Sequence, residues 1–181
     1  LIPRYFKLAA ECDPITSSSV CIPRSIFDSV GLFTPDVCWG EDTEMWGRIA
    51  LHYDIAFSMK ECVIYHYGAT NRANERVKVE RDHPFIKVGL EHIDDYHKVM
   101  SVTEMDDLKE YIESLKIKVA ERALKSGRPD IAREMVLKCK TSRQLRWKMM
   151  TYFMSFLPPS VYQNARAIKW GFRNNSQLKR P

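Results

Sequence analysis

Apolar residues recur at two different spacings along this chain, and the presence of both spacings constrains its fold more than any other feature. Residues 54–58 and 61–66 alternate or run apolar, and residues 15–22 end in a β-prone run, which predicts three short strands. Elsewhere the spacing is three or four residues, which places apolar side chains on one face of a helix. The longest such series comprises Leu108, Tyr111, Ile112, Leu115 and Val119. Strands and helices in one chain indicate a mixed α/β fold.

Two short helices are expected in the first third of the chain. One follows Pro23, which suits a first helical turn, and it stops at Gly31. The other begins at Glu41 and Asp42, because acidic side chains are favoured at the positive end of the helix dipole, and it ends near His52. The predicted buried face of this second helix comprises Met45, Trp46, Ile49 and Tyr53.

A helical hairpin is expected over residues 101–140. Thr103 and Asp106 match a variant of the capping box that opens a helix. Gly127 and Pro129 then interrupt the apolar series, and apolar spacing resumes beyond them. The two helices of the hairpin are therefore predicted on either side of this break.

The charges are divided unevenly. Residues 135–181 hold ten of the 28 Lys and Arg and none of the 23 Asp and Glu, so residues 1–134 carry 18 basic and 23 acidic side chains. A strongly basic segment suits an anionic partner such as a membrane or a nucleic acid. No RNA-binding motif accompanies it, so no nucleic-acid partner is expected. The five cysteines include no C-x-x-C pair and predict neither a disulfide framework nor a zinc site.

The basic tail of residues 141–181 is rich in Met and Phe. One helical face of its last part is apolar and comprises Val161, Ala165, Ile168 and Phe172. Arg166, Lys169 and Arg173 occupy other faces and are the predicted contacts with a membrane surface. Either the tail lies on an anionic membrane or its apolar face packs on the rest of the chain, and the sequence leaves both open.

Three segments stand in an order that points to a family. Residues 30–33 read Val-Gly-Leu-Phe, residues 39–48 read Trp-Gly-Glu-Asp-Thr-Glu-Met-Trp-Gly-Arg, and residues 65–70 read Tyr-His-Tyr-Gly-Ala-Thr. With the predicted strand–helix junction at Arg24, this order resembles the acceptor half of family 2 inverting glycosyltransferases with the GT-A fold. The family shows G-x-F, E-D-x-x-x-W-x-R and H-x-G-x-T/S segments in that order. The likeness covers about residues 12–74.

The resemblance implies both an architecture and an activity. Residues 1–100 would form the acceptor-side part of an α/β GT-A domain whose N-terminal donor half precedes Leu1. The helical hairpin of residues 101–140 and the basic amphipathic tail of residues 141–181 would follow. The enzyme would transfer a sugar from a nucleotide-sugar donor to an acceptor hydroxyl with inversion, in the synthesis of polysaccharides, glycolipids or other cell-surface glycans.

The acidic pair carries the predicted chemistry. Inverting transfer needs a base that takes the proton of the attacking hydroxyl, and a carboxylate at a helix start is held ionised and aimed outward. Adjacent helical positions diverge by about 100°, so Glu41 and Asp42 cannot serve the same atom. The resemblance assigns the base to Asp42, while Glu41 would orient loop backbone or an acceptor hydroxyl. The alternative is that both acids only start the helix.

Neighbouring side chains have predicted roles as well. Trp39 and Gly40 are expected to bind the acceptor, with Trp39 offering a flat apolar face to a sugar, although it could instead anchor the loop. Arg48 is expected to brace the helix through Glu44, and Trp46 is expected in the core. Four histidines form no ligand spacing and are predicted to be surface residues: His52, His83, His92 and His97.

A metal is implied only through the family. Relatives hold Mg²⁺ or Mn²⁺ and the donor diphosphate near a His that corresponds to His66, and Thr70 and Arg72 would face the phosphates. The acidic D-x-D segment of the donor half does not occur in this sequence. The isolated chain is therefore expected to bind sugar nucleotide poorly and to be inactive.

The predicted partners are a nucleotide-sugar, a glycan or lipid-linked acceptor, and an anionic membrane surface. The expected location is cytoplasmic, with peripheral attachment at the inner face of the membrane. A different class of function also fits the helical half of the chain. It is a non-catalytic interaction module that binds a protein or a membrane surface through the hairpin and the tail.

Overall fold

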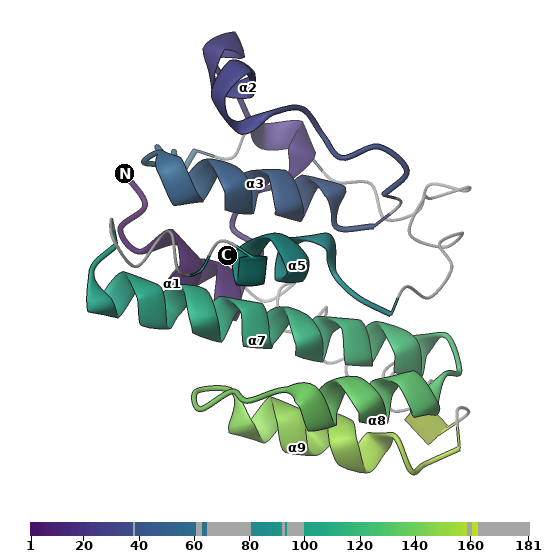
Figure 1. The fold of residues 1–181 in the computed structure, drawn as a ribbon. Coiled ribbons are helices and arrows are strands. Elements are labelled where there is room, and N and C mark those ends of the chain that lie inside the picture. Colours follow the sequence, from purple (N-terminus) through teal and green to yellow (C-terminus); the bar gives the residue numbers. More distant parts are fainter. Residues whose placement is uncertain are drawn as a thin grey trace, which may run out of the picture. The chain divides into compact units, whose positions relative to one another are not determined.

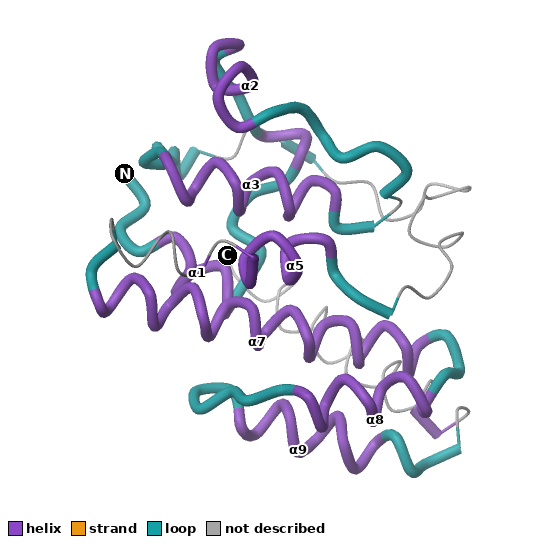
Figure 2. The backbone as a smooth tube through the Cα atoms, viewed as in Figure 1, coloured by secondary structure: helices purple, strands orange, loops and turns teal. Residues whose placement is uncertain are grey.

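The computed structural model describes residues 1–37, 39–60, 63–64, 81–91, 93, 100–158 and 161–162. These residues contain seven α-helices and one 3-10 helix, and no strand occurs among them (Figure 2). The α/β GT-A fold expected from the sequence is therefore wrong, since this architecture is helical. Residues 61, 62 and 65–80, which include most of one predicted strand, lie outside the described part.

Two of the predicted strands are replaced by local structure. In residues 15–22 the backbone turns into the 3-10 helix η1 (Ser17–Ser19), where the Ser19 hydroxyl donates to the Thr16 carbonyl at 3.0 Å. Such side chain to backbone bonds compete with strand pairing. Residues 54–58 are irregular, with a bond from the Ile2 N–H to the Ile55 carbonyl at 2.7 Å. In the described part of the chain, the apolar residues of these two segments thus have no sheet to join.

Both predicted early helices are confirmed. Helix α2 (Arg24–Val30) follows Pro23 and ends at Gly31, whose φ of 83° is a conformation that suits glycine. Helix α3 (Glu41–His52) begins at the acidic pair. Met45 and Trp46 are buried as predicted and Ile49 is partly buried, whereas Tyr53 is exposed. The buried face of α3 also contains Glu44, Gly47 and Leu51.

The chain divides into two compact units, and the division falls within helix α7 (Val102–Lys125). The first unit comprises residues 1–78 and 82–115, and the second comprises residues 79–81 and 116–181. The core of the first unit contains side chains from α1 (Tyr5–Glu11), α3, α5 (Pro84–Glu91) and the first half of α7. Helix α3 contacts α1, α2 and α5, and Figure 1 shows α5 beneath it.

The second unit contains the remainder of the predicted hairpin and one further helix. The end of α7 is followed by a turn at Gly127 and by α8 (Pro129–Lys138). Pro129, predicted as part of the break, is instead the first residue of α8, a position that suits proline. The buried apolar residues of the second unit come from the end of α7, from α8 and from the residue after it. They are Ile117, Val119, Ala120, Ala123, Leu124, Ile131, Ala132, Met135, Val136 and Cys139. Helix α9 (Leu145–Met154) lies beside α8 (Figure 1).

The capping box at the start of α7 lies two residues earlier than predicted. Ser101, not Thr103, caps the helix, because the Glu104 N–H donates to the Ser101 hydroxyl at 3.3 Å. In return the Glu104 carboxylate accepts from the Ser101 N–H at 2.9 Å and from its hydroxyl at 2.6 Å. These bonds lower the pKa of Glu104. The pair fits the S-x-x-E signature of a capping box.

Gly47 provides a test of how α3 packs on α5. In an open helix, replacing glycine by alanine would stabilise by roughly 0.5–1 kcal/mol. Here an added Cβ would lie 2.2 Å from the ring of Phe85, which is fully buried. We expect Gly47→Ala to lower the free energy of unfolding by about 1–3 kcal/mol, measured by urea denaturation.

A double variant gives the control for this prediction. Gly47→Ala combined with Phe85→Leu should lose less stability than the two single variants together, because the smaller side chain leaves room for the new methyl group. A Gly47→Ala protein more stable than the wild type would contradict the described packing of the two helices.

Candidate functional site

The start of α3 is fixed by a glycine in a left-handed conformation. Gly40 has φ 79° and ψ 11°, and its carbonyl accepts the first helical bond, from the Glu44 N–H at 2.8 Å. A Cβ at this position would lie 2.5 Å from Nε2 of His83. Two independent constraints, backbone conformation and close packing, therefore require glycine here. The role of Gly40 that this structure describes is to place the acidic pair, and acceptor binding remains a prediction.

His83 is a buried part of this site, although the sequence predicted a surface residue. Only 2% of it is exposed. Its Nδ1 accepts a hydrogen bond from the Phe85 N–H at 3.2 Å, so it caps α5 just before Pro84. Its ring meets the ring of Trp39 edge to face, with centroids 5.1 Å apart. The Asp-His-Pro sequence of residues 82–84 signals a helix start, and that signal could have found this residue.

Trp39 is half-buried and packs against His83 through one edge contact. This contact anchors the loop, which the sequence left open as one of two roles for Trp39. The part of the side chain that stays accessible lies within three residues of Asp42 in the sequence. Acceptor binding by the ring of Trp39 remains a prediction.

The Asp42 carboxylate is half-buried and is held by three donors. Its Oδ2 accepts from the Ser17 hydroxyl at 2.9 Å. Its Oδ1 accepts from the Thr43 N–H at 2.7 Å and from the Thr43 hydroxyl at 3.2 Å. The first-turn position on a 12-residue helix adds the favourable interaction with the helix dipole. Asp42 is therefore an oriented carboxylate that retains access to solvent.

Two buried phenols lie within electrostatic reach of this carboxylate. Burial raises the pKa of Tyr5 strongly, and the negative charges of Asp13 and Asp42 raise it further. Burial likewise raises the pKa of Tyr111, with smaller contributions from Tyr5, Asp13 and Asp42. Both phenols remain protonated across the physiological range. Ser17 was missed from the sequence, because only the folded chain brings its hydroxyl to the Asp42 carboxylate.

Glu44 and Arg48 hold the preceding loop against α3. The Arg48 Nε donates to Glu44 at 2.5 Å, and its Nη2 donates to the same carboxylate at 3.0 Å. The guanidinium also donates to the Val30 carbonyl, and to the Leu32 carbonyl at 2.8 Å. The predicted bracing role of Arg48 is confirmed, and the carbonyl bonds extend it to the end of α2.

The G-x-F segment and the tryptophan that follows the acidic pair belong to the same packing. The ring of Phe33 meets Trp46 edge to face with centroids 6.1 Å apart, and it lies 6.4 Å from the ring of Phe27. Trp46 is buried as predicted. Phe33 and Trp46 thus pack in the protein and support the site. The carboxylates of Glu41 and Asp42, at the start of α3, keep access to solvent.

Other predicted site residues are only partly placed. Glu41 is half-buried at the first position of α3. His66, Thr70 and Arg72, predicted to contact a metal or the diphosphate, lie outside the described residues. So do the predicted membrane contacts Arg166, Lys169 and Arg173.

The metal prediction gains no support from the described residues. Among them no group of three or more His, Cys, Asp or Glu side chains could hold a metal ion. A divalent cation prefers several oxygen ligands at once. The metal and diphosphate prediction therefore stays with His66, Thr70 and Arg72, outside the described residues.

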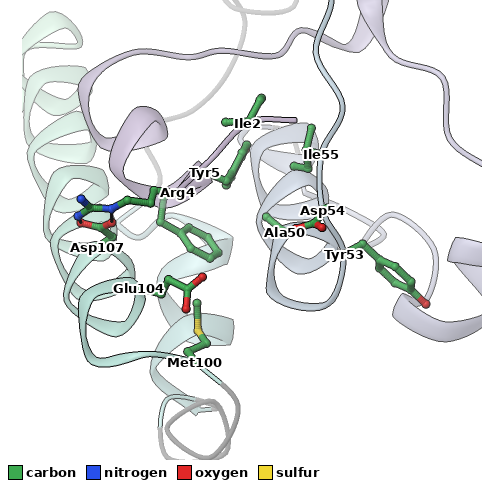
Figure 3. Close-up of a pocket in the computed structure, with 11 residues that line it drawn as sticks. Ile2, Arg4, Tyr5, Ala50, Tyr53, Asp54, Ile55, Met100, Glu104 and Asp107 are labelled. Carbon is green, nitrogen blue, oxygen red and sulfur yellow. Dashed lines mark hydrogen bonds and ion pairs between the residues drawn. The ribbon is translucent and has the colours of Figure 1, made fainter.

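A small cavity of about 80 Å³ opens elsewhere in the first unit (Figure 3). It is lined from α1, the end of α3 and the start of α7, and its lining includes none of residues 39–42. Arg4 spans part of its wall through a bidentate pair with the buried Asp107, at 2.7 and 2.8 Å. The volume is far below the roughly 300 Å³ of an ordinary ligand pocket. This cavity cannot enclose a sugar nucleotide.

In comparisons with protein-family models, with curated proteins and with solved structures, nothing matches this chain.

Paired glycine variants test the geometry of the site. Gly40 and Gly127 both have positive φ, so alanine pays about 1–2 kcal/mol of backbone strain at either position. Only at Gly40 would the new methyl group meet another side chain, because nothing lies within 4 Å of a Cβ at Gly127. We expect Gly40→Ala to cost at least about 1 kcal/mol more than Gly127→Ala in urea denaturation. Equal losses would show that His83 does not pack against Gly40.

Proposed function

We propose that this chain is the acceptor-side part of a glycosyltransferase that uses a nucleotide-sugar donor and inverts the anomeric centre. The observation that carries the proposal is the Asp42 carboxylate, oriented at the start of α3 by Ser17 and Thr43 and still accessible to solvent. The proposal uses a helix start and its loop, and it does not depend on the sheet that the described residues lack.

The proposed reaction is a single displacement. The acceptor hydroxyl oxygen attacks the anomeric carbon of the donor sugar, and the bond from that carbon to the diphosphate oxygen breaks. Asp42 takes the hydroxyl proton through a carboxylate oxygen as the new glycosidic bond forms. The nucleoside diphosphate leaves with the electrons of the broken bond. Mg²⁺ or Mn²⁺ would neutralise that leaving group in the full-length enzyme.

The neighbours of Asp42 support its role as the base. The hydroxyl of Ser17 donates to one carboxylate oxygen and the N–H of Thr43 donates to the other. The side chain is therefore held in one orientation and needs little rotation before it takes a proton. Trp39 offers an aromatic surface three residues away along the chain. The proposed acceptor is a glycan or a lipid-linked sugar, and the proposed location is the cytoplasmic face of a membrane.

Asp42→Asn tests this proposal, in the longest natural form of the protein. The amide preserves the shape of the side chain but cannot accept the hydroxyl proton, so transfer should fall by about 10²–10⁴-fold. The readout is release of nucleoside diphosphate from a panel of nucleotide sugars in the presence of a membrane extract that supplies acceptors. Asp28→Asn on the exposed face of α2 makes the same chemical change away from the site and should leave the rate unchanged.

The alternative is a non-catalytic interaction module, and one observation favours it. Helix α9 exposes large apolar side chains, as an interaction surface does. The same Asp42→Asn variant separates the two functions. An acceptor-dependent rate that survives the substitution would remove Asp42 as the base, and absence of any transfer with the wild-type protein would favour the module.

A further inference from the structure

The side of α9 that packs on the second unit is polar. Thr151 and Ser155 are each only 2% exposed, and Gln144 and Lys148 continue the same stripe at intervals of three or four residues. Lys148 donates through Nζ to the Cys139 carbonyl just beyond α8. The Ser155 hydroxyl donates to the Tyr152 carbonyl at 2.6 Å. The packed side of α9 therefore consists of small polar groups and a lysine, and Lys148 bonds it to the end of α8.

The opposite side of α9 is exposed and mostly apolar, with Arg146 among its side chains. Phe153 is 61% exposed, Phe156 just beyond the helix is 57% exposed, and Leu145 is 55% exposed. The remaining exposed apolar residues of this segment are Trp147, Met149, Met150 and Leu157. A surface helix ordinarily buries its apolar stripe, whereas much of the apolar surface of α9 is exposed. Contiguous exposed apolar surface of this kind marks an interaction site.

The charge around this surface selects its partner. No Asp or Glu follows Glu134, and all ten charged side chains of residues 135–181 are Lys or Arg. Arg143 and Arg146 are exposed at the start of α9, and the guanidinium of Arg133 lies 5.1 Å from the centre of the Phe156 ring. Cationic groups thus border the apolar surface. A partner that fits must offer an apolar phase beneath a layer of negative charge.

We propose that α9 is a docking helix that lies on an anionic lipid surface, with Leu145, Met149, Phe153 and Phe156 inserted among the acyl chains. Arg143 and Arg146 would then lie at the level of the lipid phosphates, which attract their charges. Trp147 is suited to the boundary between headgroups and acyl chains. Nucleic acid satisfies only half of these requirements, since its phosphates match the charge but offer no place for Met, Leu and Phe side chains.

The orientation along the surface follows from the length of the helix. Among the described residues, no helix is long and apolar enough to cross a membrane. Ten residues at 1.5 Å each make α9 about 15 Å long, which suits a helix that lies in the plane of the headgroups. The inference is independent of the proposed transferase, because no residue of α3 takes part in it.

Vesicle binding tests the proposal. The full chain is mixed with sedimentable vesicles of phosphatidylcholine alone or of phosphatidylcholine with phosphatidylglycerol, and the bound fraction is measured after centrifugation. We expect binding to the anionic vesicles only, with at least a tenfold weaker partition coefficient when salt rises from about 0.05 to 0.5 M. Equal binding to both vesicles, or binding to neither, would overturn the proposal.

Matched variants locate the contact. Phe153→Glu places a charge on the exposed side of α9, and Leu90→Glu makes the equivalent change on the exposed side of α5, where the residue is 51% exposed. Both should keep the far-ultraviolet circular dichroism of the wild type. Phe153→Glu should weaken vesicle binding at least tenfold, and Leu90→Glu should leave it within about twofold.

The result also separates a lipid surface from a protein partner. Sedimentation velocity without lipid measures whether the chain associates with itself. Self-association that Phe153→Glu abolishes would assign this surface to a protein contact and overturn the lipid proposal. A monomer whose vesicle binding depends on Phe153 supports it.

Discussion

The guanidinium of Arg48 is the group on which the candidate site depends. It joins the buried Glu44 carboxylate on its own helix to the carbonyls of Val30 and Leu32, at the end of α2 and in the loop that follows. A buried carboxylate without this partner would be costly, and the two carbonyls would lose their donor. Helix α2 and its loop are thereby tied to α3 at a point close to the acidic pair.

Within this short segment, some side chains hold the site together and others stay accessible to solvent. Phe33 and Trp46 form the apolar contact, Glu44 and Arg48 form the polar one, and both are directed toward the protein. Gly40 and His83 set the backbone where the helix begins. The carboxylate of Asp42 is left half-buried and is oriented by Ser17 and Thr43.

The second unit uses the same kinds of side chain in a different way. The apolar residues of α8 are buried, whereas those of α9 are largely exposed and its polar stripe is packed. Tyr152 and Phe156 still meet edge to face, with ring centroids 5.1 Å apart, so the exposed surface is ordered by aromatic contacts. An ordered apolar surface loses little conformational freedom when a partner covers it.

Local signals in the sequence predicted much of the helical structure. Pro23 with Gly31, the acidic pair at residues 41 and 42, and the break at residues 127–129 each define a helix end through their own backbone chemistry. The Ser101–Glu104 box carries the same kind of signal, and it lies only two residues before the predicted Thr103–Asp106 box. Helix ends are predictable because their causes lie within a few residues.

The errors arose where the outcome depends on distant residues. An alternating segment becomes a strand only if another strand pairs with it, and residues 54–58 have no such partner in the described structure. The burial of His83 depends on Gly40 and Trp39, more than forty residues away. Whether the apolar residues of the tail are buried or exposed stayed open in the sequence, because periodicity does not show which element covers them.

A double-mutant cycle on Glu44 and Arg48 tests the central claim most directly. The free energy of unfolding would be measured for Glu44→Gln, Arg48→Met and the double variant by urea denaturation. If the pair anchors the site as described, each single variant should lose about 3–5 kcal/mol. The double variant should lose less than the sum of the two, by about 0.5–3 kcal/mol. Additive losses below about 1 kcal/mol each, as expected of an exposed ion pair, would contradict the account.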